Sequence, residues 1–566
     1  MTNPVWRPSR LAPACLVAVV LGASLVLLGG TPAVAGMGAV EPGPDLVVDA
    51  TGPGGHAISP DIYGVNFVPA KLGRQIDVPV DRWGGDSAET YNWLIGADNP
   101  GADWYFEDIS DCWAATYAYC SGHKTNNVRA YVQQIELDRS LGATTLLQLP
   151  MAGGVARFAP VAQPLPCAYP KSVYPHQDAF DPYDPNCGDG LDHGKRLTGI
   201  LSRVETPINA AWDRRWVQSL VKQFGPAAKG GVGIYELGNE PSLWGQTHAD
   251  IQPRPETAKE LITKSIALAS AVKQVDPSAA VLGFSEWGWI GYFCSEADTY
   301  GSGCSSTACT TSVDCANHGH LPMAEWYLQQ FARYDAKTHL RHLDYFDVHY
   351  FAQGGDSTEV TRSLWDPTYT DPSWIDERIA LIPRLRCWVD GHVPGLCPNA
   401  NGYYPGTKIS ISEYDLSLAG VGAQANAIIE GDTLGIFARE NVSLACHWAQ
   451  PVDGDELDDA FLMYRDYDGH GSKFGDEWVD STSADQAEIS VYGARRSSDG
   501  AYTVMVINKS SQALRSTLQL EGGISGAVHA WQWDGGPIKQ VSTPSRAGNA
   551  LTTTYPPLSM TLYVVG

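Results

Sequence analysis

Residues 233–241 read Gly-Ile-Tyr-Glu-Leu-Gly-Asn-Glu-Pro, an apolar run that is followed at once by the carboxylate of Glu240. Residues 407–415, Thr-Lys-Ile-Ser-Ile-Ser-Glu-Tyr-Asp, place Glu413 after a second apolar run. About 170 residues separate the two glutamates, which corresponds to about three βα units of a barrel of ~250 residues. Carboxylates at the C-terminal ends of different barrel strands can converge on one cleft, as cleavage of a glycosidic bond requires.

Eight strand candidates alternate with helix-like stretches along the middle of the chain. They are Ile62–Phe67, Val78–Trp83, Thr144–Leu149, Gly233–Leu237, Ala280–Phe284, Tyr345–Tyr350, Lys408–Ile411 and Leu444–Trp448. Apolar residues recur at helical spacing in Arg129–Leu141, Ala211–Phe224 and Glu256–Val275. The alternation predicts an α/β fold, a (β/α)₈ TIM barrel with long insertions. The cysteine-rich insertions 151–200 and 287–320 follow strands, so we expect them on the catalytic face.

After about residue 485 the pattern changes to short alternating runs separated by turn residues. The runs are Ala487–Arg495, Ala501–Asn508, Ser516–Gln519, Ala527–Trp533 and Met560–Val565. They predict an antiparallel β-sandwich, to which Leu46–Thr51 could add a strand. The expected organisation is therefore a signal peptide (1–35), an N-terminal segment that contributes a strand to the β-sandwich (36–60), the catalytic barrel (61–484) and the β-sandwich domain (485–566).

The N-terminus has the sequence features of an export signal. Arg7 and Arg10 precede the apolar core Leu16–Leu28, and Ala33-Val34-Ala35 offers a small-residue cleavage site. A permanent membrane anchor is the alternative, but the apolar core is short for a span of about 20 residues. We therefore expect the signal to be removed and the mature protein to be secreted, extracellular and without stable membrane insertion.

Composition narrows the classes of function. The chain of 566 residues has a formal net charge of −25, which argues against nucleic acid as a partner, because such binding needs basic patches. Its 18 Trp, 26 Tyr and 13 Phe offer rings on which sugars can stack, although large secreted barrels are rich in aromatic residues anyway. We see no apolar stripe that demands a protein partner, so a monomer is expected.

The cysteines predict disulfides that close long loops. With Cys15 in the signal, eleven of the 12 cysteines remain, and ten of them form close pairs in the sequence. These are Cys112 and Cys120, Cys167 and Cys187, Cys294 and Cys304, Cys309 and Cys315, and Cys387 and Cys397. Export favours disulfides between such neighbours, although the sequence leaves the connectivity among Cys294–Cys315 open. Cys446 lies in an apolar run and is expected to be free and buried, and no CxxC pair supports a zinc site.

Glu240 and Glu413 are the predicted catalytic residues. A glycosidase needs an acid of raised pKa to protonate the glycosidic oxygen, and a second carboxylate as nucleophile or base. Asn239 could hydrogen-bond a sugar hydroxyl, and Pro241 would fix the turn that follows the strand. Glu286 also follows a strand. We expect it to line a subsite or to support the residues that touch the substrate, and the role of nucleophile in place of Glu413 is the alternative.

Further residues are predicted to bind substrate or to support the pair. Arg82 could keep the nucleophile ionised, or form an ion pair in the core. His349 and Tyr350 end the sixth strand and could orient the nucleophile, or be satisfied in the core. Asp347 and Asp415 are expected to be structural or pKa-tuning groups. The predicted substrate-binding set is Arg82, Asp86, Trp93, Asn239, Glu286, Trp287, His349, Tyr350 and Trp448, with Trp448 as a stacking floor and Trp289 as a further subsite candidate.

Together, these segments resemble glycoside hydrolase family 44. The matching motifs are Arg82–Asp86 followed by Tyr91-Asn92-Trp93, Asn239–Trp244, Glu286–Trp289, Trp365–Tyr369 and Ser412–Asp415. They span about residues 60–450, the whole predicted barrel. Asn-Glu-Pro alone is common to many retaining glycosidases, whereas the set in this order is far more specific.

The resemblance implies a (β/α)₈ barrel with a β-sandwich built from both chain ends. It also implies retaining endo-hydrolysis of β-1,4-glucans such as soluble cellulose, mixed-linkage glucan and xyloglucan, with Glu240 as acid/base and Glu413 as nucleophile. The alternatives are a related retaining glycosidase acting on xylan, mannan or arabinose side chains, and a non-catalytic carbohydrate-binding barrel.

This chain departs from the family pattern beside the predicted site. Asp86 stands where the family usually has Asn, and Gly238 stands where an Asp often precedes Asn-Glu-Pro. No cofactor is expected to be required for catalysis and no catalytic metal is predicted. Some relatives bind calcium, so a structural calcium ion is considered. Asp453–Asp459 is the acidic candidate segment, although a solvated loop is the favoured interpretation.

Overall fold

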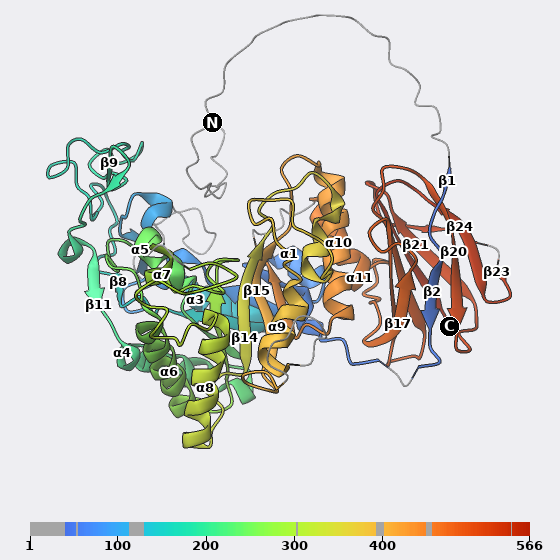
Figure 1. Cartoon of the computed structure of the whole chain (residues 1–566), viewed down its shortest axis with the longest axis horizontal. Coiled ribbons are helices and arrows are strands. Elements are labelled where there is room, and N and C mark those ends of the chain that lie inside the picture. Colours follow the sequence, from blue (N-terminus) through green and yellow to red (C-terminus); the bar gives the residue numbers. More distant parts are fainter. Residues whose placement is uncertain are drawn as a thin grey trace, which may run out of the picture.

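The computed structural model describes residues 40–52, 55–111, 129–300, 304–391, 401–448, 455–544 and 546–566. A barrel domain and a β-sheet domain lie side by side (Figure 1). Segments from both chain ends build the β-sheet domain. The predicted signal peptide and Cys112, Cys120 and Cys397 lie outside the described residues, so those predictions stay predictions. None of the described helices is long and apolar enough to cross a membrane.

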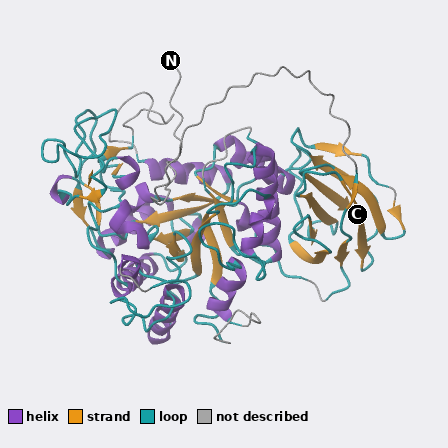
Figure 2. Cartoon of the chain, turned by 45° about the horizontal axis from the view of Figure 1, so that its top comes forward, coloured by secondary structure: helices purple, strands orange, loops and turns teal. Residues whose placement is uncertain are grey.

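Eight parallel strands close the barrel, and all eight were predicted. They are β3 (Gly64–Asn66), β4 (Val80–Trp83), β7 (Thr144–Leu149), β12 (Ile234–Leu237), β13 (Ala280–Glu286), β14 (Tyr345–Phe351), β15 (Lys408–Asp415) and β16 (Leu444–His447). Each strand pairs with the next in chain order, and β16 pairs with β3 to close the cylinder. Figure 2 shows these strands enclosed by helices. The (β/α)₈ prediction is therefore confirmed.

The inside of the barrel changes from apolar to polar along the strands. One buried apolar layer contains Val80, Leu146, Ile234, Leu282, Tyr345, Leu444 and Cys446, and Cys446 is free and buried as expected. Because side chains on one face of a strand recur every second residue, Arg82, Gln148, Glu236 and Asp347 form the next layer. All four are completely buried. The polar layer faces the C-terminal ends of the strands, where barrel enzymes hold their active sites.

Helices surround the strands. They are α1 (Ala70–Gln75), α3 (Ala130–Leu141), α4 (Ala210–Phe224), α6 (Ala258–Val275), α8 (Met323–Thr338), α9 (Leu381–Asp390), α10 (Ala423–Arg439) and α11 (Glu456–Arg465). The predicted helices 129–141, 211–224 and 256–275 correspond to α3, α4 and α6. Helix α6 starts later than predicted because Thr257 and Glu260 form a capping box. Asn209 caps α4 through the amides of Ala211 and Trp212.

The two predicted insertions follow β7 and β13. The first contains β8 (Gly154–Ala156), paired with β11 (Glu205–Pro207), and β9 (Leu191–Asp192), paired with β10 (Lys195–Arg196). Its outer part projects at the top left of Figure 1. Disulfides Cys167–Cys187, Cys294–Cys304 and Cys309–Cys315 confirm three of the predicted pairs. Cys387 is disulfide-bonded as well.

The second domain is the predicted β-sandwich. Its strands are β1 (Glu41–Pro42), β2 (Leu46–Asp49), β17 (Glu477–Ser483), β18 (Ile489–Arg495), β19 (Tyr502–Asn508), β20 (Leu514–Glu521), β21 (Val528–Trp533), β22 (Lys539–Val541), β23 (Arg546–Ala547), β24 (Ala550–Tyr555) and β25 (Ser559–Val565). Strand β2 lies between β17 and β20, so the N-terminal segment adds a strand as expected. The structure adds β17, which lies entirely before residue 485, the predicted start of the β-sandwich domain. The first half of β17 pairs with β18 and the second half with β2, so this strand connects the two sheets.

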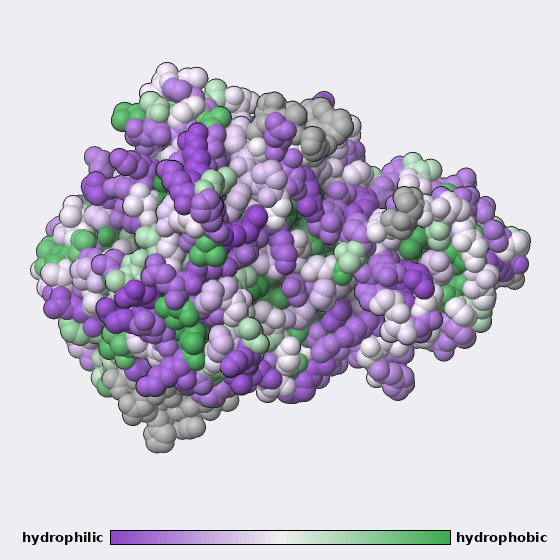
Figure 3. Space-filling view, turned by 90° about the horizontal axis from the view of Figure 1, so that it is seen from below, coloured by the Kyte–Doolittle hydropathy of each residue, from purple (hydrophilic) through white to green (hydrophobic). Residues whose placement is uncertain are grey.

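A buried polar cluster joins the two domains. Asp432 of α10 accepts hydrogen bonds from Lys509 Nζ at 2.8 Å, Ser490 Oγ at 2.5 Å and Tyr492 Oη at 2.6 Å, all from the sandwich. Thr361 Oγ1, from the barrel domain, donates to the same carboxylate at 2.7 Å. Both charged side chains of the Lys509–Asp432 pair are essentially unexposed. The outer surface seen in Figure 3 is mostly hydrophilic, which contrasts with this buried contact.

Replacing Lys509 by Met should destabilise the protein strongly, because it leaves the Asp432 carboxylate buried without its cation. We expect the free energy of unfolding to fall by about 3–5 kcal/mol, measured by denaturant unfolding. Lys539→Met is the matched control, since the Lys539–Asp534 pair is exposed, and should cost no more than about 1 kcal/mol. Equal effects of the two substitutions would contradict the prediction.

Candidate active site

Glu240 and Glu413 face each other at the C-terminal end of the barrel. Glu240 follows β12, and Glu413 lies near the C-terminal end of β15. A carboxylate oxygen of each glutamate and a ring nitrogen of His349 all lie within 4.8 Å of one another. Glu240 retains slight exposure, whereas His349 is fully buried. The two carboxylates that the sequence singled out are therefore brought together around one histidine.

A left-handed backbone aims Glu240 at its partner. Its φ is 48° and its ψ is 57°, a conformation that is unfavourable for a residue with a side chain. The amide of Glu240 donates to the carbonyl of Ser285 at 2.9 Å, and Ser285 itself has a φ of 53°. Pro241 then opens the short helix η6 (Pro241–Leu243). Two strands therefore hold the strained turn in place.

Glu286 supports this turn from behind. Ser242 Oγ donates to Glu286 Oε1 at 2.5 Å, and the Ser242 amide donates to Oε2 at 3.3 Å. Glu286 is buried. Burial raises the pKa of Glu286 to about 7. The structure thus places Glu286 as a support for the acid turn.

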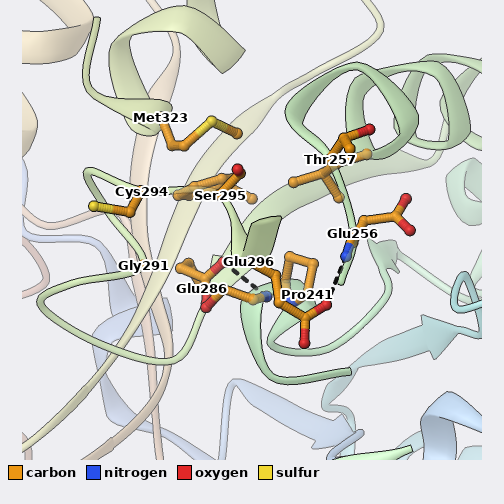
Figure 4. Close-up of a pocket in the computed structure, with 12 residues that line it drawn as sticks. Pro241, Glu256, Thr257, Glu286, Gly291, Cys294, Ser295, Glu296 and Met323 are labelled. Atoms are coloured by element: carbon orange, nitrogen blue, oxygen red, sulfur yellow. Dashed lines mark hydrogen bonds between the residues drawn. The ribbon is translucent and has the colours of Figure 1, made fainter. Parts of the chain in front are cut away.

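A small cavity lies beside this support (Figure 4). Glu286, Glu296 and Glu256 lie around it, together with Pro241 and other side chains. Glu296 accepts hydrogen bonds from the amides of Gly245 at 2.6 Å and Glu256 at 2.7 Å. These bonds hold α5 (Trp244–Thr247), which continues from η6. The cavity therefore belongs to the scaffold behind Glu240.

A bulge brings Glu413 into the barrel. In the β14–β15 ladder Asp347 pairs with Ser410 and His349 pairs with Glu413, so β15 contains one more residue than β14 between these pairs. Ser412 remains inside the barrel, where its hydroxyl donates to Asp347 at 2.7 Å. The extra residue rotates Glu413 toward the cleft, as β-bulges do near active sites. Asp347 is thus structural, as expected.

Arg82 links the polar layer to Glu413. Its Nε and Nη2 donate to Glu236 at 2.7 and 2.9 Å, and its Nη1 donates to Glu413 Oε2 at 2.7 Å. Asn66 and Asn239 accept the remaining bonds at 2.9 and 3.0 Å. Arg82 is fully buried, and its ion pair with Glu236 in the core orients the guanidinium toward Glu413.

The two glutamates differ in their electrostatic environments. Burial raises the pKa of Glu240 to about 8, and the charges of Glu413 and Asp86 contribute, against the hydrogen bond from His349. Burial also raises the pKa of Glu413, but His349 and Arg82 oppose this rise. Two carboxylates this close share a proton more readily than they both ionise. Because Arg82 contacts Glu413 and not Glu240, this arrangement favours the ionised form of Glu413 and the protonated form of Glu240.

His349 is positioned between the two carboxylates. Its Nδ1 lies 2.9 Å from Glu240 Oε1 and 3.7 Å from Glu413 Oε2. Burial disfavours its charge, but Glu413 and the bonds to Glu236 and Glu240 raise the pKa of His349 well above its ordinary value. Tyr350, the next residue, points to the other side of β14. Burial raises its pKa, and Asp371 and Ser363, outside the barrel, act on it. Tyr350 is therefore not at the pair.

Asn239 and Asp86 form the edge of the site. The Asn239 amide donates to Glu89 at 2.7 Å, and its Nδ2 donates to Asp86 Oδ1 at 3.0 Å. Gly238 has a φ of 71°, and a Cβ there would lie 3.2 Å from a Glu89 oxygen, so an Asp at this position would be strained. His248 Nε2 lies 3.7 Å from Asp86 Oδ1, and among the described residues neither of its ring nitrogens has a hydrogen-bond partner.

The predicted tryptophans differ in position. Trp448 lies at the site, with its ring centroid 6.0 Å from the Arg82 guanidinium. A Cβ on Gly85 would come within 2.8 Å of that ring, so the glycine permits the approach. Trp93 instead stacks on Trp216 of α4 at 6.4 Å, away from the pair. Trp289 is buried against Phe293 and Arg384, while Trp287 is half-buried beyond β13.

The sequence analysis missed Glu236 and His248. Glu236 lies within an apolar run, and a charge at an inward position of a buried strand is a signal that could have found it. His248 follows Glu240 by a few residues, but nothing local marks it. Glu236 binds Arg82, which contacts Glu413. His248 lies near Asp86, whose charge raises the pKa of Glu240.

Glu107 is a further buried carboxylate that the sequence analysis did not single out. It is completely buried, and within the described part of the chain neither of its carboxylate oxygens has a hydrogen-bond partner. Burial raises its pKa to about 9, and the charges of Asp181 and Asp184, also buried, contribute. Both aspartates already accept amide hydrogen bonds, and the three carboxylates do not come close enough together for a shared metal ion. In the predicted calcium segment Asp453–Asp459, of which 453–454 lie outside the described residues, Asp455 caps α11 and Asp459 accepts a hydrogen bond from Trp533.

A barrel whose strand ends present an acid and an ionised carboxylate in this geometry defines a glycoside hydrolase. Endoglucanase A of Paenibacillus lautus is 30% identical over 537 residues, covering 89% of this chain and 70% of that protein. The chain belongs to glycoside hydrolase family 44, whose model matches residues 97–354.

Solved structures agree with this assignment. CelM2, a bifunctional glucanase-xylanase from a metagenome library, superposes with a TM-score of 0.84 at 34% identity, covering 93% of this chain and 99% of its own. The family 44 xyloglucanase of Paenibacillus polymyxa gives a TM-score of 0.73 at 26% identity, with 92% and 99% covered. The resemblance drawn from the sequence motifs is therefore confirmed.

Replacing Glu413 by Gln should lower the pKa of Glu240, because it removes a nearby negative charge and keeps the volume of the side chain. We expect a fall of about one to three pH units from the value of about 8. Carboxyl ¹³C NMR titration would measure it. Asp415→Asn is the matched control, since Asp415 follows on the same strand and does not act on Glu240. An unchanged pKa in Glu413→Gln would contradict the prediction.

Proposed function

We propose that this protein is a secreted, retaining endo-β-1,4-glucanase with Glu240 as acid/base and Glu413 as nucleophile. The observation that carries this proposal is the separation of the two glutamates, whose closest oxygens lie within 4.8 Å. Retaining enzymes hold their carboxyl groups about 5–5.5 Å apart, whereas inverting enzymes need about 6.5–9.5 Å to admit a water molecule. An upper limit of 4.8 Å between oxygens lies below the inverting range and supports double displacement.

In the first step Glu240 donates its proton to the glycosidic oxygen while Glu413 attacks the anomeric carbon. The C–O bond to the leaving sugar breaks, and a glycosyl–Glu413 ester forms. Arg82 favours the ionised form of Glu413, and the ion pair between Arg82 and Glu236 holds the guanidinium in place so that Glu413 is aligned for attack. The raised pKa of Glu240 keeps its proton available near neutral pH.

In the second step Glu240, now ionised, takes a proton from water, and the resulting hydroxide attacks the anomeric carbon. The ester bond breaks, Glu413 is released as a carboxylate, and Glu240 regains its proton. His349 contacts both carboxylates, so it can stabilise whichever of them is charged in each step. Asp86 and Asn239 line the same edge and are proposed to bind sugar hydroxyls, and Trp448 is proposed to stack against a ring.

The substrate proposal rests on what similar proteins act on. Their names include an endoglucanase, a xyloglucanase and a bifunctional glucanase-xylanase. We propose β-1,4-glucans, including soluble cellulose, mixed-linkage glucan and xyloglucan, as the main substrates. Xylan is the second candidate, because CelM2, named a glucanase-xylanase, superposes with a TM-score of 0.84.

The mature protein should release short oligosaccharides from carboxymethyl-cellulose, mixed-linkage glucan and xyloglucan, with xylan and mannan tested in parallel. Reducing-end release and product length measure the activity, and ¹H NMR of the first product should show the β-anomer. An initial α-anomer would contradict the retaining mechanism. Cleavage of xylan or mannan alone would show that the substrate is not a β-1,4-glucan. Binding of glucans by the folded protein without cleavage would favour a non-catalytic carbohydrate-binding barrel.

Two variants serve as controls for the roles. Glu413→Gln should abolish turnover on every substrate while leaving the melting temperature near that of the wild type. Glu240→Gln should lose polymer cleavage but still react with an aryl glycoside whose leaving group needs no protonation. Substantial polymer cleavage by Glu413→Gln would exclude it as nucleophile.

We also propose that catalysis needs no cofactor. Export through residues 1–35 and a monomeric state remain part of the proposal. Three disulfides among the described residues fit an oxidising compartment.

A further inference from the structure

Trp104 and Tyr183 form an aromatic pair that no step above uses. Their ring centroids lie 5.9 Å apart and their planes are inclined by 25°. Tyr183 is 65% exposed, although a single exposed aromatic residue would be unremarkable. Trp104 ends η2 (Gly101–Trp104), and Tyr183 lies in the outer part of the first insertion. Two segments far apart in the sequence therefore build one aromatic surface.

The pair is held rigidly. The Tyr183 amide donates to Asp181 Oδ1 at 2.9 Å, and its carbonyl accepts a bond from Gln163 Nε2 at 2.7 Å. Disulfide Cys167–Cys187 closes the loop that contains Tyr183. On the other side, Tyr105 meets the Trp104 ring edge to face at 5.5 Å. A surface fixed in this way loses little conformational entropy when it binds a ligand.

Helix η2 packs against the elements that follow Glu240. Gly101, at the start of η2, packs so closely on Thr247 and His248 that no Cβ would fit between them. Thr247 ends α5, the helix that follows Glu240. Helix η2 therefore connects the edge of the active site to the aromatic pair.

We propose that Trp104 and Tyr183 form an outer sugar-binding platform, on which a residue of the bound β-1,4-glucan stacks at a distance from the bond that is cleaved. The inference rests on the proposed function, because it extends the same cleft. The apolar face of a β-linked glucose matches a flat aromatic surface. The Tyr183 hydroxyl makes no hydrogen bond within the described part of the chain, so it is free to bind a sugar hydroxyl.

The test compares Tyr183→Ala with the wild type on β-1,4-gluco-oligosaccharides of increasing length. On the shortest oligosaccharide that the wild type cleaves, kcat/KM should be unchanged, because such a chain does not reach the platform. On longer chains and on polymer it should fall about three- to tenfold, the range expected for one lost stacking contact. Affinity electrophoresis in a Glu413→Gln background should show the same loss for long glucans.

Tyr183→Phe should retain most of the wild-type affinity, since it keeps the ring. Val173→Ala, in the same disulfide-closed loop and 51% exposed in the wild type, is the control for disturbance of the insertion and should have no effect. Loss of activity at all lengths, or no change at any length, in Tyr183→Ala would overturn the platform while leaving the proposed function intact. A wild-type protein that cleaves no glucan would overturn the proposed function, and the platform with it.

Discussion

The contact between Arg82 and its two glutamates organises the polar interior of the barrel. A buried guanidinium must be paired on nearly all of its donors, and here Glu236, Glu413, Asn66 and Asn239 supply the acceptors. This arrangement fixes the position of Glu413 and leaves Glu240 without a direct cationic partner other than His349. The two carboxylates therefore differ in their environments before any substrate arrives: Arg82 favours the ionised form of Glu413, whereas burial and nearby negative charges favour the protonated form of Glu240.

This asymmetry requires local strain. Glu240 and Ser285 both adopt a left-handed backbone, and irregular pairing on β13 and β15 displaces side chains from regular alternation. Residues in such conformations cost free energy, which only a firmly packed surrounding can offset. Glu286 meets that need by holding Ser242, and Glu296 does so by holding Gly245. Buried carboxylates with raised pKa values, which look catalytic in isolation, here hold the turn that carries the acid.

Much of the fold could be predicted because hydrophobic periodicity and strand–helix alternation are local signals. The eight strands and the catalytic glutamates followed from apolar runs that end in polar residues. Bulges leave no local signal, so the sequence could not show that Glu413 lies inside a strand. In the sequence, Trp93 and Tyr350 could not be distinguished from site residues such as Trp448 and His349. Packing against α4 turns Trp93 away from the two glutamates. The alternation of side chains along β14 turns Tyr350 away from them as well. Strand β17 was not predicted because its polar residues obscure the alternation of apolar and polar side chains that marks a strand.

Helix α10 gives the sandwich a part in supporting the active site. Tyr414, next to Glu413 on β15, donates its hydroxyl to Glu430 of α10 at 2.7 Å. Two residues further along the helix, Asp432 binds Lys509, Ser490 and Tyr492 of the sandwich. The back of the strand that carries Glu413 is therefore tied, through a buried helix, to the second domain. Because both contacts are buried, loosening the domain interface would lower the stability of the protein and would also release the support behind Glu413. In the mechanism that we propose, the position of Glu413 must stay within a fraction of an ångström for attack on the anomeric carbon.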